Sequence, residues 1–154
     1  MERQTGCRSY FSIFSDGEIQ DGVGFAANAN SEFEPDEVTR RLELQPFRTM
    51  RMGMPRRKGG GTYPFSGWCG CLQEEPALDG EEQCLRIVRA LWDKIPALNQ
   101  IRREVDVEFT MKIVPRICDG EQPVLWFDRE IIEFCFHTGT EISIEMDLRE
   151  EELE

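Results

Sequence analysis

The chain has 154 residues and a formal net charge of −12 at pH 7. A chain of this length fits a single domain, residues 1–154, with one hydrophobic core. Hydrophobic residues make up 40% of the composition, which excludes an intrinsically disordered chain. The acidic excess disfavours nucleic acids and anionic membranes as partners, because like charges repel.

The N-terminal segment lacks the charged and apolar regions of a signal peptide. No apolar run is long enough to span a bilayer, so we expect a cytoplasmic protein. Thiols stay reduced in that compartment. We therefore expect all of the cysteines to be free; they stand at positions 7, 69, 71, 84, 118 and 135.

The first third of the chain contains two strand patterns and one helix pattern. Residues 10–14 are rich in aromatic and β-branched side chains, and residues 23–27 form a weaker second strand pattern. Residues 34–42 are predicted to form a short helix, because Pro35 suits the first helical position and acids follow it. Pro46 closes this segment.

The next predicted strand covers residues 68–73 and contains the most chemically distinctive run of the chain. Alternate residues of a strand share a face. Trp68 and Leu72 are therefore expected in the core, and Cys69 and Cys71 are expected together on the opposite face.

The clearest helix pattern covers residues 79–95, where apolar residues recur at helical spacing. Asp79 is a predicted N-cap and Glu82 follows three residues later, as in a capping box. Pro96 ends or kinks this helix. Residues 105–113 then alternate strictly between apolar and polar, which predicts a strand with one solvated face.

The last part of the chain is predicted to form a strand, a helix and a strand. Residues 124–127 indicate a short buried strand, and Asp128 is the predicted N-cap of a helix that Gly139 ends. Residues 142–148 alternate as a strand with one solvated face, and residues 149–154 form an acidic tail.

Strands with one polar face, interleaved with a few helices, indicate an α+β fold. We expect an antiparallel or mixed sheet of about five to six strands, with two to three helices packed mainly on one face. The core covers residues 9–148, apart from a basic, glycine-rich loop at 48–61.

Three segments resemble a known family, the bacterial "domain of unknown function 4279" family. "SYFSIFS" and "FEPDEVTRRLELQPFRTMRMG" are similar to its first strand and acidic-proline helix. "SGWCGCL" is similar to its single-tryptophan strand, and "LWFDREIIEFCFHTGTEISIEMDL" to its closing strand-helix-strand. This chain differs by extra residues before the first helix and by a longer insertion after Gly53. The resemblance implies an α+β domain with no established activity, and it supplies no catalytic residues.

One metal-site hypothesis arises from the cysteines. Three thiolates and one imidazole suit Zn²⁺, and the chain offers them at Cys69, Cys71, Cys135 and His137. The spacing is unfavourable, because zinc sites use longer separations and helical residues two apart point to different sides. The competing interpretation is that these are small buried cysteines, and we expect no metal or cofactor.

No catalytic motif is present, so we expect no enzymatic activity. His137 is the only histidine, and its place near the end of a predicted helix favours a role at the helix dipole. The alternative hypothesis is an enzyme or a small-ligand-binding protein with a pocket lined by Trp68, Trp92 or Trp126.

The basic part of the loop is the region that breaks the overall charge. Between residues 48 and 58 there are cations and methionines but no acid. Such a segment fits contact with an acidic partner or a phosphate group, or is held by the acids of the protein itself. The candidates for partner contact are Arg48, Arg51, Arg56, Arg57, Lys58 and Trp68.

The leading hypothesis is a protein-binding module of immunity or regulatory type, whose acidic surface meets a basic protein. The small size, the acidity and the missing catalytic motif favour it. The second hypothesis is the enzyme or small-ligand-binding protein with a tryptophan-lined pocket, and the third is metal binding through Cys69 and Cys71.

Overall fold

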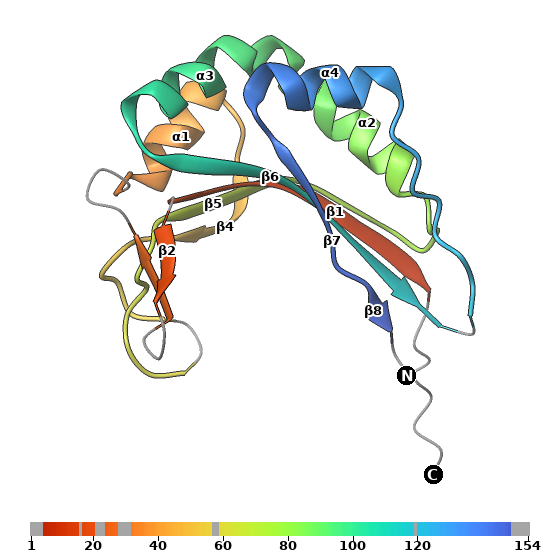
Figure 1. Ribbon diagram of the computed structural model, residues 1–154, viewed down its shortest axis with the longest axis horizontal. Coiled ribbons are helices and arrows are strands. Elements are labelled where there is room, and N and C mark those ends of the chain that lie inside the picture. The colour runs from red at the N-terminus through yellow and green to blue at the C-terminus, as the bar shows by residue number, and fades with distance from the viewer. Residues whose placement is uncertain are drawn as a thin grey trace.

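The main sheet is mixed, and its strand order is β4-β5-β1-β6-β7, with β8 paired to β6. A computed structural model (Figure 1) describes residues 5–15, 17–20, 24–27, 32–56, 59–118 and 120–148. The strands of this sheet are β1 (Gly6–Ser15), β4 (Pro46–Met50), β5 (Gly67–Glu75), β6 (Val107–Ile117), β7 (Glu141–Ile144) and β8 (Asp147–Leu148). A separate hairpin consists of β2 (Gly17–Gln20) and β3 (Gly24–Ala27).

The helices lie together on one face of the main sheet, and the opposite face is concave (Figure 1). They are α1 (Pro35–Leu42), α2 (Gly80–Leu91), α3 (Ile95–Glu104) and α4 (Arg129–Thr138), with a 3-10 turn at Trp92–Lys94. This arrangement confirms the predicted α+β fold with a mixed sheet. No helix in the described ranges is long and apolar enough to cross a membrane.

Three helix ends follow from local sequence, as predicted, whereas the helix expected at 79–95 ends at Leu91. The side chain of Asp79 accepts a hydrogen bond from the backbone N–H of Glu82 at 3.1 Å, and Asp128 accepts one from Ile131 at 3.2 Å. Each carboxylate satisfies an N–H that has no partner inside the helix. Gly139 ends α4 with a left-handed φ of 68°, a conformation that costs glycine little.

The helical layer continues beyond the point where the sequence predicted an end or a kink. Pro96 lies in the first turn of α3, where its missing N–H leaves no hydrogen bond unmade. From α3, the guanidinium of Arg102 donates to the carbonyls of Thr138 at 2.7 Å and Gly139 at 3.0 Å. A side chain of α3 therefore completes the C-terminus of α4.

The core lies between β1, β6 and the helices. Phe11 and Ile13 pair with Met111 and Phe109 across the two central strands, and all four side chains are fully buried. The predicted alternation at 105–113 is confirmed here, because the odd-numbered residues of β6 from Val107 point into the core.

The predictions for two segments are wrong. The predicted loop at 48–61 begins with the last residues of β4, which pairs with β5 as an edge strand. Residues 124–127 form only a single bridge, between Val124 and Asp79, and Trp126 is 65% exposed. Leu125 and Phe127 pack against the core and are partly buried, whereas Val124 is 48% exposed, so the segment is a half-buried connection and not a buried strand.

The predicted strand at 142–148 is interrupted, and Pro115 of β6 explains where. Ile113 accepts a hydrogen bond from the backbone N–H of Glu145 at 2.9 Å, so Ile113 and Pro115 direct their backbone groups toward β7 and β8. Proline has no N–H to donate, and the ladder breaks between β7 and β8. Ile144, in the edge strand β7, and Met146 are 40% and 46% exposed, against the prediction.

A β-bulge in β5 overturns the prediction for Cys69 and Cys71. Phe11 pairs with Gly70 and Ser9 with Gln73, so β5 has one extra residue there. The bulge turns Cys71, with φ of 57°, against the hydrophobic core, whereas Cys69 stays on the concave face. Leu72, predicted in the core, is 37% exposed. An inserted residue reverses the faces of the side chains that follow it.

Trp68 occupies the core as predicted, and its ring explains the glycine at position 70. The indole N–H donates to the hydroxyl of Thr39 at 3.0 Å, which holds α1 against β5. The indole ring lies where a Cβ on Gly70 would stand, so that any side chain there overlaps it.

We therefore predict that Gly70→Ala lowers the free energy of unfolding by about 1–3 kcal/mol, because the added methyl group displaces the indole from a filled core. Urea unfolding followed by circular dichroism measures the change. Gly60→Ala is the matched control, since a Cβ there meets no atom within 4 Å, and it should shift stability by less than about 0.5 kcal/mol. Equal unfolding midpoints for the two variants would contradict the prediction.

Candidate functional site

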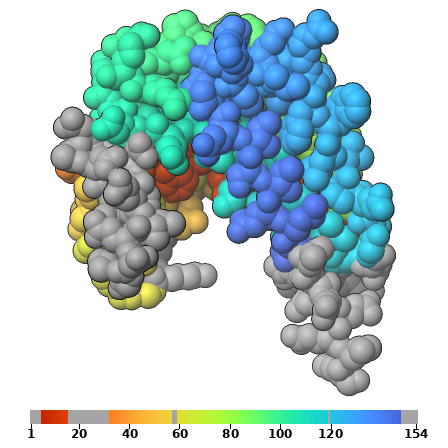
Figure 2. All heavy atoms as spheres, in the orientation of Figure 1, coloured from red at the N-terminus to blue at the C-terminus, as the bar shows by residue number. Residues whose placement is uncertain are grey.

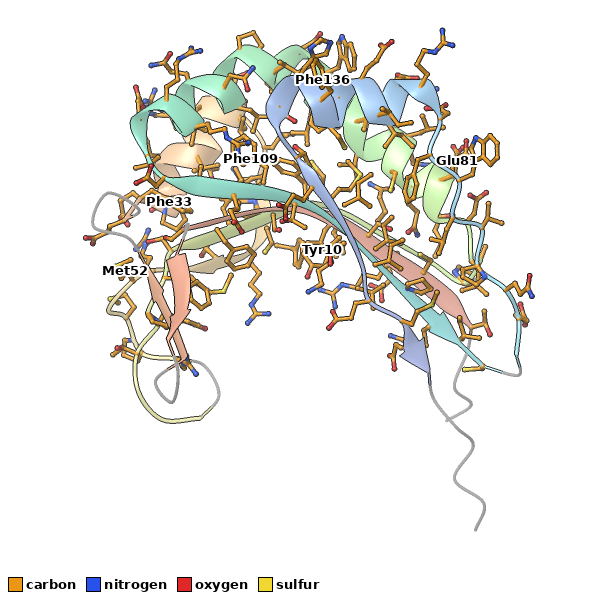
Figure 3. All side chains as sticks on the ribbon, viewed as in Figure 1. Tyr10, Phe33, Met52, Glu81, Phe109 and Phe136 are labelled. Atoms are coloured by element: carbon orange, nitrogen blue, oxygen red, sulfur yellow. The ribbon has the colours of Figure 1, made fainter. Side chains whose placement is uncertain are left out.

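The candidate site is the concave face of the main sheet, which none of the described helices covers (Figures 1 and 2). β1 and β6 direct alternate residues to this face, opposite the core. Figure 3 shows Tyr10 on the concave side and Phe109 on the helical side of the same sheet. Figure 2 shows the hollow, with β1 in red at its roof.

Two aromatic rings and a guanidinium form an ordered cluster on this face. The rings of Tyr10 and Phe47 meet edge to face, with centroids 5.2 Å apart and an interplanar angle of 80°. The guanidinium carbon of Arg8 lies 5.5 Å from the Tyr10 centroid and 5.3 Å from that of Phe47. The negative ring faces attract the cation and fix its position, although Phe47 is 36% exposed.

A second irregularity of the sheet brings Phe47 and Arg48 to this cluster. Pro46 pairs with Gly70 and Arg48 pairs with Cys69, so Phe47 is an extra residue on β4. Such irregularities re-aim side chains at the edges of sheets. The sequence prediction did not name Arg8, Tyr10 or Phe47. Because Phe11 is buried, the alternation of the strand places Arg8 and Tyr10 on the opposite face, and this signal could have identified them.

A cavity of about 570 Å³ lies beside the cluster, and Arg8, Tyr10, Arg48 and Arg116 line it. Four carboxylates also line it, and one of them is Glu74. The other three have partners: Glu75 pairs with Arg86, Glu145 pairs with Lys112 at 3.1 Å, and Asp147 pairs with Arg116 at 3.7 Å. No ion pair involves Arg8 or Arg48 within the described part of the chain. The cavity therefore offers cations to a ligand.

The remaining candidates for partner contact have different surroundings. Arg51 forms ion pairs with Glu34 and Asp36, so the acids of the protein itself hold it. Arg56 is exposed, next to the bridge between Pro55 and Thr62. Arg57 and Lys58 lie outside the described residues, as does the predicted acidic tail 149–154.

Trp68 is withdrawn as a partner-binding candidate, because it is 0% exposed. The three tryptophans also occupy different places. Trp92 and Trp126 are 37% and 65% exposed on the surface, and neither lines the cavity on the concave face. The described residues give no support to a pocket formed by these three side chains.

The cysteines and the histidine do not come together. Cys69 lies on the concave face, while Cys71 and Cys135 pack against the core from β5 and α4. His137 is exposed near the end of α4, with its ring beside Phe136. Across the described segments, no group of three or more histidine, cysteine, aspartate and glutamate residues is placed to hold a metal.

Burial keeps these thiols protonated. It raises the pKa of Cys69, Cys71 and Cys135 to about 11 and that of Cys84 to about 12. At Cys69 the neighbouring cations Arg48, Lys112 and Arg8 lower the pKa, but burial has the larger effect. A protonated thiol is a poor nucleophile and a poor metal ligand, so the arrangement does not favour redox or metal chemistry at neutral pH.

A comparison with protein families agrees with the resemblance seen in the sequence. The model of the family described as domain of unknown function (DUF4279) matches residues 5–149, which include the whole main sheet and α1 to α4. No curated protein and no solved structure matches the chain.

The buried thiols predict a loss of stability at alkaline pH. A thiol whose pKa is raised by folding, here from 9.0 to about 11, stabilises the folded state fully below pH 9. This contribution is lost as the pH rises through the folded pKa, because the unfolded chain then releases protons more readily.

We expect the urea midpoint to fall between pH 9 and pH 11. In the double variant Cys71→Ala and Cys135→Ala, which lacks two of these thiols, the fall should be smaller. The same pH dependence in both proteins would show that other groups cause it.

Proposed function

We propose a function from the geometry of this chain. The chain belongs to the DUF4279 family, which is described only as a domain of unknown function. The chain is a protein-binding module of immunity or regulatory type that acts without catalysis. Its binding surface is the concave face of the main sheet, at the side where β1 and β4 carry the cluster of Arg8, Tyr10 and Phe47.

One observation carries this proposal: the concave face presents an ordered aromatic and arginine cluster that no described helix covers. Aromatic residues and arginine are enriched at the energetic centres of protein interfaces. Because the rings already hold the guanidinium, little side-chain freedom is lost when a partner binds. The surface is thus arranged for recognition before the partner arrives.

The charge distribution indicates the chemistry of the partner. The net charge of −12 attracts a protein of net positive charge over long range and repels nucleic acids. At close range, Arg8 and Arg48 favour an acidic side chain, and the rings of Tyr10 and Phe47 favour apolar contact. We therefore propose a basic protein that inserts a segment with one acidic residue and one apolar residue.

The test is affinity capture from a lysate of the source cells at low salt, with the full chain immobilised. A protein captured by the unaltered chain should be lost with Phe47→Ser and with Arg48→Glu, because both change the exposed part of the cluster. It should be retained with Phe136→Ser and Arg89→Glu, matched controls on the helical layer, where Phe136 is 82% exposed (Figure 3). Circular dichroism establishes that each variant is folded.

Loss of capture in Phe136→Ser but not in Phe47→Ser would place the binding surface on α4 and overturn the assignment to the concave face. If no protein is captured even at low salt, the protein-binding function itself is wrong. Release of the partner by added salt is expected, since charge attraction contributes to the association.

A further inference from the structure

Two arginines that line the cavity on the concave face have buried Nε donors. The Nε atoms of Arg8 and Arg116 have almost no exposed surface, and neither has a hydrogen-bond partner among the described residues. The carboxylate of Asp147 is 3.7 Å from the Nε of Arg116, which is beyond hydrogen-bond distance. A buried N–H without an acceptor destabilises a protein, so these two call for an explanation.

The two arginines reach the cavity from neighbouring strands and are held there. Arg8 comes from β1, where Tyr10 and Phe47 fix its guanidinium, and Arg116 comes from the end of β6, beside Asp147. Arg48 of β4, on the other side of β5, also lines the cavity. Guanidinium groups in such an arrangement suit a planar oxyanion, because they present several N–H donors in fixed directions.

The acids of the cavity limit the charge of the ligand. Glu145 forms an ion pair with Lys112, and Asp147 forms one with Arg116. Glu74 is the cross-strand neighbour of Arg8, but the two side chains do not form an ion pair. These carboxylates repel a multiply charged anion more strongly than a singly charged one. A carboxylate, with one negative charge, therefore fits better than a phosphate.

We infer that this cavity is a carboxylate-binding subsite, in which Arg8 and Arg116 donate to the oxygens and Arg48 adds positive charge. The inference rests on the proposed function, because the carboxylate belongs to the acidic residue of the inserted protein segment. The adjoining rings of Tyr10 and Phe47 receive the apolar side chain of the same segment.

The experiment is a titration of the full chain with N-acetyl-phenylalanine, which carries one carboxylate and one aromatic ring. Nuclear magnetic resonance follows the Nε–H groups of Arg8 and Arg116 at mildly acidic pH, where their exchange with water is slow. Both signals should shift and saturate at millimolar ligand. N-acetyl-phenylalaninamide, which lacks the charge, should leave them unchanged, as should sodium chloride at equal ionic strength.

Variants separate the subsite from general charge effects. Arg8→Gln should weaken the binding of N-acetyl-phenylalanine about tenfold or more, the usual effect of losing a hydrogen bond to a charged group. Arg48→Gln, at an exposed position where folding is not at stake, should also weaken it. Arg89→Gln, on the outer face of α2, should not.

Several results would overturn the inference. These are the absence of saturable binding, equal binding of the amide, and an affinity that Arg8→Gln and Arg48→Gln both leave unchanged. Tighter binding of inorganic phosphate would overturn the assignment to a carboxylate. If the probe fails but protein capture still depends on Phe47, the subsite is wrong and the proposed function stands. If the probe binds but no protein is captured, the subsite stands and the protein-binding function is wrong.

Discussion

The structure depends on the pleat of β1, the strand that pairs with β5 on one side and with β6 on the other. Its odd-numbered side chains, including Phe11 and Ile13, lie in the core, and Arg8 and Tyr10 lie on the concave face. A register slip of one residue would exchange these faces. The hydrophobic requirement of the core therefore also determines which residues stand on the concave face.

Buried polar contacts hold the helices in register with this strand. The hydroxyl of Ser9 donates to the side chain of Gln83 at 2.6 Å, and the amide of Gln83 donates to the carbonyl of Cys7 at 2.7 Å. These bonds join α2 to β1 inside the core, where an unsatisfied polar group is costly. The bond from Trp68 to Thr39 joins α1 to β5 in the same way. These bonds hold α1 and α2 on one side of the main sheet.

The predictions that were confirmed concern features that neighbouring residues determine. Asp79, Asp128 and Gly139 begin or end helices through contacts within a few residues, and the alternation at 105–113 needs only one buried face. The predicted faces of Cys71 and Leu72 were wrong because the bulge depends on how β5 fits against β1. The interruption between β7 and β8 arises likewise, since Pro115 matters only once β6 has neighbours on that side.

The sequence by itself determined the α+β class, the places of most helix ends and the absence of known catalytic motifs, because local propensities and spacing express them. It also predicted partner contact by arginines near residue 50, and one of these, Arg48, lines the cavity. Only the tertiary structure decided that Arg8, Arg48 and Arg116 meet at one cavity. These residues come from strands far apart in the chain, and pairing between such strands depends on packing that no local pattern records.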